Sequence, residues 1–375
     1  MVNHESLPRR PLFERFAGLS MHKGSGLSLV ALADLPTPVR ALDRLVQGQG
    51  ATRLWLKDDG PSSPHYGGNK VRKLELLLAA ARDRRARTVV TFGYAGSNHA
   101  TATAVHASRL GMRSVSILLP QQNAAYLRKN LLVSAAVGAE LHEYPSRAAL
   151  YAGAALTLVR CRLRDGAAPF VIAPGGSSPL GTVGFVNAAF ELAGQMDAGL
   201  LPIPDCIYAA GGSLGTVVGL GIGLAALGLP TRVVAVRVVE ERYVNPSLAV
   251  ALWRKTVALL RAADPSFPEV GDAGDRIVIR GEFFGGLYAH LTAEADEASR
   301  LALDCERLAL DVTYTAKTMA CVLADLRSGA LRGRDVLFWN SCNSSDLGAL
   351  ASRATPEDLP PRLRRYFDVD QSATR

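Results

Sequence analysis

A lysine at the end of a flexible turn is the first residue whose type and place could do chemistry. Lys70 follows Gly67, Gly68 and Asn69 in the segment GGNKVRKLE and precedes apolar residues at helical spacing. The positive end of a helix dipole and partial burial both disfavour a charged ammonium group. Both effects lower a lysine pKa and favour an amine nucleophile that can form a Schiff base. An exposed first-turn lysine is the alternative that this segment leaves open.

A second candidate site lies where a strand pattern runs into the segment FGYAGSNHATATA, residues 92–104. Ser97 and Asn98 open the helix that follows, and a helix start of this kind can bind a carboxylate or a phosphate. The same residues can also serve simply as an N-cap. His99 and His106 could share one face of this helix, where a packed core histidine is the simpler interpretation.

A third candidate is the glycine-rich turn in YAAGGSLGTVVGLGIG, residues 208–223. It predicts a phosphate cradle of backbone N–H groups and hydroxyls, formed by Gly211, Gly212, Ser213, Leu214, Gly215 and Thr216. The turn is not a P-loop, because no Gly-Lys-Ser/Thr follows it. A nucleotide site remains an alternative, with Glu240 or Glu241 as the ribose-binding acid, and so does a tight turn that binds nothing. A similar loop at 171–185 indicates only a close backbone approach.

These junctions need a scaffold, and from residue 53 onward short β-branched runs alternate with helical patterns. Strands are predicted at 53–57, 88–93, 114–119, 139–144, 169–174, 205–210, 231–239, 276–281 and 335–339. Helices are predicted near 70–86, 97–110, 124–137, 147–164, 181–197, 214–228, 246–263, 292–309 and 315–328. This alternation favours parallel sheets with helices on both faces, which bind ligands at the carboxyl ends of their strands. Residues 1–30 are expected to be an extension, and the last 20 residues a surface tail with a short helix at most.

Length and composition limit the classes of protein. With 375 residues and 48% hydrophobic residues, the chain can form two domains or one large α/β unit. It has no apolar run of about 20 residues and no apparent secretory signal, so we expect a cytoplasmic protein that does not contact a membrane. The formal charge of +8 comes from scattered arginines, which argues against nucleic-acid binding. The cysteines show no metal-ligand spacing, so we expect no metal.

Taken together, the motifs resemble those of the fold-type II pyridoxal-phosphate enzymes, and most of all the D-cysteine desulfhydrase and 1-aminocyclopropane-1-carboxylate deaminase family. The resemblance extends from about residue 32 to about residue 341. It is carried by the segments LADLPTPVRALDRL, LWLKDDG, GGNKVRKLE, GSNHATATAV, PGGSSPLGTVGFVNAAFEL, AGGSLGTVVGL and LALDVTYTAKTMACVL. It implies two parallel-sheet α/β domains of the tryptophan synthase beta type, with pyridoxal 5′-phosphate in the cleft between them, and a homodimer. The larger domain would be 1–73 with 187–375, and the smaller one 74–186.

The resemblance also implies roles for individual residues. Lys70 would hold the cofactor as a Schiff base and would move the substrate's α-proton. Thr315 would lie near the pyridine nitrogen, where the deaminase branch has a glutamate, and a hydroxyl there favours β-elimination over ring opening. The implied catalytic residues are Lys70, Ser97, Tyr288 and Tyr314. The cofactor would be bound by Lys70, Asn98, Gly211, Gly212, Ser213, Leu214, Gly215, Thr216 and Thr315, and the substrate by Ser97, Asn98, His99, Tyr288 and Tyr314.

The function implied is that of a pyridoxal-phosphate-dependent lyase or deaminase. It would act on a small amino acid by D-cysteine desulfhydrase-like α,β-elimination, giving a 2-oxo acid and ammonia. The alternatives are 1-aminocyclopropane-1-carboxylate deamination, a β-replacement or racemase reaction, a binding protein without turnover, and a nucleotide-binding oxidoreductase.

The chain departs from the family pattern at several positions that would surround the substrate. The segment 100–103 replaces the usual arginine and glutamine, and Ala289 and Ala316 replace glycines. The segment Asn340–Ser345 replaces the usual His-Thr-Gly-Gly turn. An altered substrate pocket is therefore expected.

Overall fold

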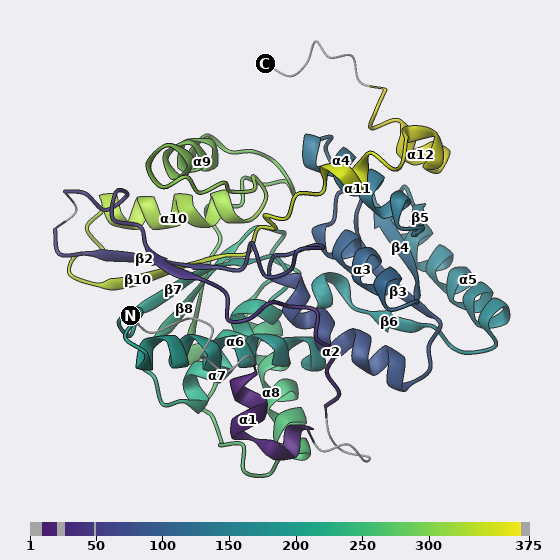
Figure 1. Cartoon of the computed structure of the whole chain (residues 1–375). Coiled ribbons are helices and arrows are strands. Elements are labelled where there is room, and N and C mark those ends of the chain that lie inside the picture. The colour runs from purple at the N-terminus through teal and green to yellow at the C-terminus, as the bar shows by residue number, and fades with distance from the viewer. Residues whose placement is uncertain (1–9, 21–26, 49, 369–375) are drawn as a thin grey trace. The chain divides into compact units, whose positions relative to one another are not determined.

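The computed structural model describes residues 10–20, 27–48 and 50–368, so much of the predicted extension at 1–30 lies outside the described residues. The chain forms two compact units (Figure 1). The larger unit contains the chain up to Ser63, Gly67–Leu76 and Ser177–Ser344. The smaller unit contains Pro64–Tyr66, Leu77–Gly176 and the chain from Ser345 onward. Helix α2, Lys70–Asp83, connects them.

The larger unit is built on a six-stranded sheet, as far as the described residues show, with the strand order β1-β2-β10-β7-β8-β9. Its strands are β1 (Val39–Ala41), β2 (Arg53–Asp58), β7 (Cys206–Gly211), β8 (Arg232–Arg237), β9 (Ile277–Arg280) and β10 (Asp335–Asn340). All neighbours pair in parallel except β1, which runs antiparallel to β2. The sequence does not predict β1, because three residues are too short for a periodic pattern.

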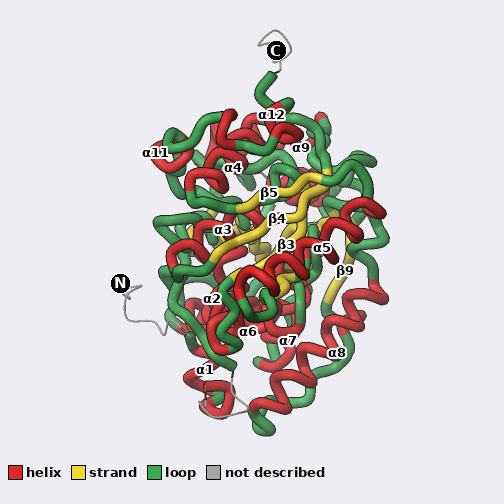
Figure 2. The backbone as a smooth tube through the Cα atoms, turned by 90° about the vertical axis from the view of Figure 1, so that its right-hand side faces the viewer, coloured by secondary structure: helices red, strands yellow, loops and turns green. Residues whose placement is uncertain are grey.

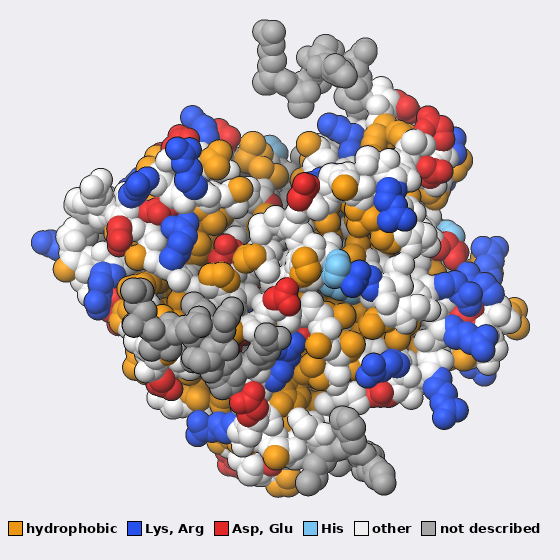
Figure 3. Space-filling model, viewed as in Figure 1, with side chains coloured by type: hydrophobic (Ala, Val, Ile, Leu, Met, Phe, Trp, Pro, Cys, Tyr) orange, Lys and Arg blue, Asp and Glu red, His pale blue; other side chains and the backbone are white. Residues whose placement is uncertain are grey.

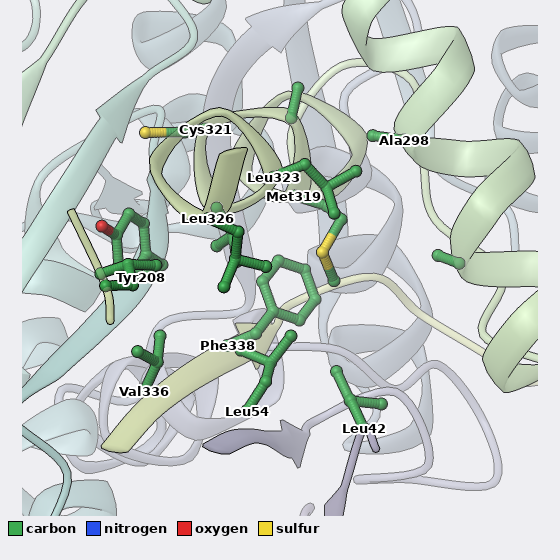
Figure 4. Close-up of a cluster of buried hydrophobic side chains, with 14 of the residues drawn as sticks. Leu42, Leu54, Tyr208, Ala298, Met319, Cys321, Leu323, Leu326, Val336 and Phe338 are labelled. Atoms are coloured by element: carbon green, nitrogen blue, oxygen red, sulfur yellow. The ribbon is translucent and has the colours of Figure 1, made fainter. Parts of the chain in front are cut away.

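Helices cover both faces of this sheet, as the alternating pattern predicts. On one face lie α9 (Ala293–Glu306) and α10 (Thr315–Arg327), and on the other α6 (Pro179–Asp197), α7 (Gly215–Ala226) and α8 (Pro246–Ala263) (Figure 1). Figure 4 shows Leu54, Phe338 and Met319 among the side chains that fill the space between the sheet and α10. Burial of each such side chain contributes about 1.5–3 kcal/mol.

The described part of the N-terminal segment packs against the larger unit. It forms α1 (Pro11–Arg15) and the short helix η2 (Ala17–Ser20), and it buries Leu12 and Phe13. The backbone N–H of Leu12 donates to Asn187 Oδ1 at 3.1 Å. Helices of this length carry too little periodicity to be predicted from sequence.

The smaller unit contains a parallel four-stranded sheet, within the described residues, in the order β5-β4-β3-β6. Figure 2 shows β3 (Thr88–Tyr94), β4 (Arg113–Leu119) and β5 (Glu140–Glu143) side by side; β6 is Phe170–Ile172. Helices α3 (Asn98–Arg109) and α4 (Ala125–Ala136) form one apolar cluster with Leu118, and α5 (Arg147–Asp165) forms another with Ile117. Because neighbouring residues of a strand point to opposite faces, these clusters lie on the two sides of the sheet. Arginine side chains gather over α5 (Figure 3).

The C-terminal segment belongs to the smaller unit and is more than a surface tail. It forms α11 (Gly348–Ala351), η5 (Pro356–Asp358) and α12 (Pro361–Arg364). Leu359, Leu363 and Tyr366 are buried in the same cluster as Leu127 and Leu131 of α4.

Candidate active site

Lys70 is the first residue of α2, as its sequence context predicts. The turn before it depends on two glycines, because a Cβ on Gly67 would lie 2.1 Å from the carbonyl oxygen of Gly60. Gly68 has φ +80°, and a Cβ there would lie 2.8 Å from the carbonyl oxygen of Ser341. A side chain at either position would clash with this backbone, so the turn can present Lys70 in this way only with glycine.

The amine of Lys70 lies in a partly enclosed, aromatic environment. Its Nζ donates to Asn69 Oδ1 at 2.9 Å and lies 5.7 Å from the ring centroid of Tyr314. Burial lowers the pKa of Lys70 to about 8, although the negative charge of Asp311 acts in the opposite direction. A substantial share of Lys70 is therefore a neutral amine, the nucleophilic form, at slightly alkaline pH.

A set of hydrogen-bond donors converges at the start of α7. The backbone N–H of Gly215 donates to Ser177 Oγ at 3.1 Å, and Ser177 Oγ lies 3.0 Å from Ser213 Oγ. Lys73 Nζ reaches the same Ser177 Oγ at 3.2 Å. A Cβ on Gly215 would lie 2.6 Å from Ser177 Oγ and 2.8 Å from Lys73 Nζ, so only glycine leaves room here. We call Lys73, Ser177, Ser213 and Gly215 the anion cradle.

The anion cradle fits the phosphate of pyridoxal phosphate. Lys73 is buried, and both its burial and the nearby Lys70 cation lower its pKa well below 10.5. A bound dianion would offset both effects, and a helix start is the usual place for one. Asn69 connects the cradle's helix to the reactive amine, because its Nδ2 donates to Thr216 Oγ1 at 3.1 Å while its Oδ1 accepts from Lys70. The residues present therefore suit both the phosphate and the aldehyde end of the cofactor.

The sequence points to the 211–216 turn but not to Lys73 or Ser177. Lys73 lies three residues after Lys70, a spacing that places two side chains on one helix face, and this was the available signal. Ser177 lies in the glycine- and serine-rich loop at 171–185, whose partner no local pattern reveals.

The two predicted tyrosines form a pair. Their hydroxyl oxygens lie 2.6 Å apart, and the rings meet edge to face. Tyr314 precedes α10, and its backbone N–H donates to Asp311 Oδ1 at 2.7 Å. Tyr288 is followed by Ala289, whose φ of 62° is a conformation that favours glycine. The alanine that departs from the family pattern thus adopts the backbone conformation of a glycine.

Thr315 is buried at the first position of α10, and its hydroxyl is engaged by Asp311. Thr315 Oγ1 donates to Asp311 Oδ2 at 2.8 Å and accepts from the backbone N–H of Asp311 at 2.8 Å. Because the hydroxyl proton goes to a carboxylate, the oxygen can offer a further partner a lone pair but no proton.

A buried charged network holds the base of α2 on the larger unit. Arg72 donates to Asp59 Oδ1 at 2.8 Å and to Glu191 Oε2 at 2.8 Å. Lys57 donates to Glu191 Oε1 at 2.6 Å, and Trp339 Nε1 to Asp59 Oδ2 at 2.8 Å. All these side chains are almost inaccessible to solvent. The sequence does not predict this network, which joins residues distant along the chain.

Ser97, Asn98 and His99 lie at the start of α3 in the smaller unit. Ser97 Oγ accepts from the backbone N–H of Ala100 at 3.3 Å, so it caps the helix. Asn98 Oδ1 accepts from Asn130 Nδ2 at 2.8 Å. His99 is buried, and His106 Nε2 lies 3.0 Å from the carbonyl oxygen of Tyr66. Burial lowers the pKa of His106 to about 4, so it is a neutral core residue.

The structure thus places Lys70, the 211–216 turn, Tyr288, Tyr314 and Thr315 in the larger unit, and Ser97, Asn98 and His99 in the smaller one. Within the part of the chain that the structure describes, no cluster of three or more His, Cys, Asp or Glu residues could hold a metal ion. No helix of the described residues has the length and apolar character needed to cross a membrane.

Comparison with known proteins supports the same chemistry. Residues 30–341 match the family model described as pyridoxal-phosphate dependent enzyme. A nocardicin C-9′ epimerase of Nocardia uniformis subsp. tsuyamanensis is 34% identical, over 89% of this chain and 98% of that protein. A putative 1-aminocyclopropane-1-carboxylate deaminase of Pyrococcus horikoshii is 31% identical, over 82% and 90%. A D-cysteine desulfhydrase of Klebsiella pneumoniae is 33% identical, over 77% and 85%.

A solved structure of a 1-aminocyclopropane-1-carboxylate deaminase homologue is similar in fold. It superposes with a TM-score of 0.75 at 29% identity and covers 92% of this chain and 100% of its own.

Proposed function

Because this chain belongs to the pyridoxal-phosphate dependent enzymes, in the D-cysteine desulfhydrase and 1-aminocyclopropane-1-carboxylate deaminase family, we propose that it removes the α-proton of a small amino acid and eliminates its β-substituent. One water would be consumed, and the products would be the protonated β-substituent, a 2-oxo acid and ammonia. The observation that carries the proposal is the amine of Lys70, which has a pKa of about 8 and is linked through Asn69 to the start of α7, where the anion cradle lies.

Bound pyridoxal phosphate supplies an electron sink that stabilises negative charge at the substrate's α-carbon. Lys70 would be the amine that holds the cofactor's aldehyde, and the anion cradle would hold its phosphate. Once free of the cofactor, Lys70 Nζ would be a base whose pKa of about 8 suits removal of the substrate's α-proton near neutral pH.

The Tyr288–Tyr314 pair is the proposed proton donor. In a pair of hydroxyls 2.6 Å apart, one donates to the other, and this bond stabilises the phenolate that forms when the accepting tyrosine gives up its proton. A departing thiolate is such an acceptor. Ser97, Asn98 and His99 are proposed to bind the substrate carboxylate, which the capped start of α3 favours electrostatically.

Epimerisation at the α-carbon is a second candidate. It is supported by the similarity to the nocardicin C-9′ epimerase over 98% of that protein, and by the segment Asn340–Ser345, which departs from the family's pattern. Both reactions begin when Lys70 removes the α-proton. They differ in the next step, which is loss of the β-substituent in elimination and return of a proton to the opposite face in epimerisation.

The test begins with the protein loaded with pyridoxal phosphate and reduced with borohydride, after which peptide mass spectrometry locates the cofactor. It is expected on Lys70 and absent from Lys70→Ala. Oxo-acid release is then measured with D-cysteine, L-cysteine, β-chloroalanine and serine, and α-proton exchange is followed in D2O. Oxo acid supports elimination, whereas exchange with inversion but no oxo acid supports epimerisation.

Ring opening is tested separately with 1-aminocyclopropane-1-carboxylate, which has no α-proton to remove. Turnover of this compound alone would overturn the proposed role of Lys70. Neither exchange nor oxo acid from any of these amino acids, with the cofactor attached, would overturn the proposed function.

A further inference from the structure

The loop that follows β10 is the segment in which the sequence differs most plainly from the family pattern. It contacts the turn that precedes Lys70. We call residues 340–344, which begin with the last residue of β10, the 340–344 loop. The backbone N–H of Gly67 donates to Asn343 Oδ1 at 2.7 Å, and the backbone N–H of Asn69 donates to the carbonyl oxygen of Ser341 at 3.3 Å. Gly67 and Asn69 belong to the turn directly before Lys70. The loop therefore binds the turn that presents the amine.

The 340–344 loop is itself held in place at its start. Asn340 is buried, its Nδ2 donates to Asp58 Oδ1 at 2.8 Å, and its Oδ1 accepts from the backbone N–H of Cys342 at 3.1 Å. The backbone N–H of Ser344 donates to the carbonyl oxygen of Gly60 at 3.2 Å. Because its two ends are bound to Asp58, the last residue of β2, and to Gly60 just after it, the loop can act as a fixed support.

The contact between the loop and the turn is close. A Cβ on Gly68 would lie 2.8 Å from the carbonyl oxygen of Ser341 and 3.1 Å from the backbone nitrogen of Asn343. A shift of the loop would therefore be transmitted to the turn by direct backbone contact.

Movement of the turn would reach the amine through Asn69. This side chain accepts from Lys70 Nζ at 2.9 Å and donates to Thr216 Oγ1 at 3.1 Å, at the start of α7. The distance between the amine and the anion cradle thus depends on where the turn lies.

We propose that Asn343 is a positioning residue, whose side-chain oxygen holds the Gly67 N–H and so sets the place of the Lys70 amine relative to the anion cradle. This inference rests on the proposed function, because it assumes that the cofactor bridges the two. The 340–344 loop then tunes how the lysine meets the cofactor, in addition to any effect on the substrate.

The test separates attachment to Lys70 from binding to the cradle. Pyridoxal phosphate reports both, whereas inorganic phosphate reports the cradle alone. In Asn343→Ala we expect covalent attachment at Lys70 to slow by about tenfold, the effect of one ordinary hydrogen bond, while phosphate affinity stays within about twofold. Asn343→Asp keeps an acceptor oxygen and should attach the cofactor at close to the wild-type rate.

A matched control is Asn245→Ala. Asn245 Oδ1 also accepts a backbone N–H, from Leu248 at 3.0 Å, but it does so as the N-cap of α8 and not in the turn before the lysine. This variant should attach the cofactor at the wild-type rate. Asn343→Leu, whose side chain has the branched shape of asparagine but is larger and has no acceptor, serves as a second test if Asn343→Ala does not fold.

The outcomes distinguish this inference from the proposed function. If the wild type attaches no cofactor at Lys70, the proposed function fails. If the wild type attaches it and a folded Asn343→Ala or Asn343→Leu does so at the same rate, the positioning role is overturned. Equal losses of attachment and phosphate affinity would show a general structural defect and would overturn it as well.

Discussion

Replacement of Lys73 by methionine should have opposite effects on the free protein and on cofactor binding. In the free protein Lys73 is buried, and both burial and the Lys70 cation lower its pKa. Between the lowered pKa of native Lys73 and 10.5, the unfolded chain therefore binds more protons than the native one, and the free energy of unfolding rises with pH. At pH values below this window the buried lysine is charged and lowers the free energy of unfolding by its full effect. Lys73→Met removes this dependence, and its thioether can pack near the Phe185 ring, whose centroid lies 5.8 Å from Lys73 Nζ. The cofactor-free variant should be more stable than the wild type at pH 7.

Cofactor binding should weaken at the same time. A hydrogen bond between a charged donor and an anion contributes about 1.5–3 kcal/mol, which corresponds to roughly 10- to 150-fold in affinity for pyridoxal phosphate. Urea unfolding of the cofactor-free protein and titration with the cofactor measure the two effects. Lys57→Met is the matched control, since it also removes a buried lysine but breaks the ion pair with Glu191, and it should cost about 3 kcal/mol of stability. A Lys73→Met protein that is less stable than the wild type, or that binds the cofactor equally well, would refute the reasoning.

Three further predictions concern the lysine and the tyrosine pair. The rate of covalent attachment of the cofactor should increase with pH around a midpoint of about 8, because only the neutral Lys70 amine attacks, and a midpoint near 10.5 would contradict the assigned environment. Tyr314→Phe removes one hydroxyl of the 2.6 Å pair and should lower kcat about 100-fold with little change in KM. The kinetics are measured on whichever amino acid turns over, and an unchanged kcat would exclude a proton-donor role for the pair. Ala289→Gly relieves a φ of 62° and should raise the free energy of unfolding by roughly 0.5–1 kcal/mol in urea, and a loss of stability would show that the site is unstrained.

The alternation of strands and helices could be predicted from the sequence because it depends on short-range periodicity. Helix α8 is predicted at 246–263, and the structure has Pro246–Ala263. Elements without a period, such as β1 and α1, could not be found in this way, although α1 buries Leu12 and Phe13.

The residues of the candidate site likewise divide into those with a local sequence signal and those without one. Lys70 and the 211–216 turn carry local signals, namely a lysine at a helix start and glycines at a strand end. Lys73 and Ser177 are 104 positions apart, and they meet because α6 packs against α2, where a Cβ on Gly184 would lie 2.2 Å from the carbonyl oxygen of Arg72. The capping role of Ser97 was one of two alternatives that its sequence left open, and the structure shows it directly.

The network of Arg72, Asp59, Glu191 and Lys57 beneath α2 has a consequence for how this part of the chain can change over generations. Loss of any one member leaves a buried charge without its partner, which typically lowers the free energy of unfolding by about 3–5 kcal/mol. Joint replacement of the members by apolar residues of similar volume can be nearly neutral. The four positions are therefore strongly epistatic, and double-mutant cycles between Arg72 and Asp59 should give large coupling energies. Substitutions would enter this group together or not at all, which leaves single-step variation to the exposed end of α2.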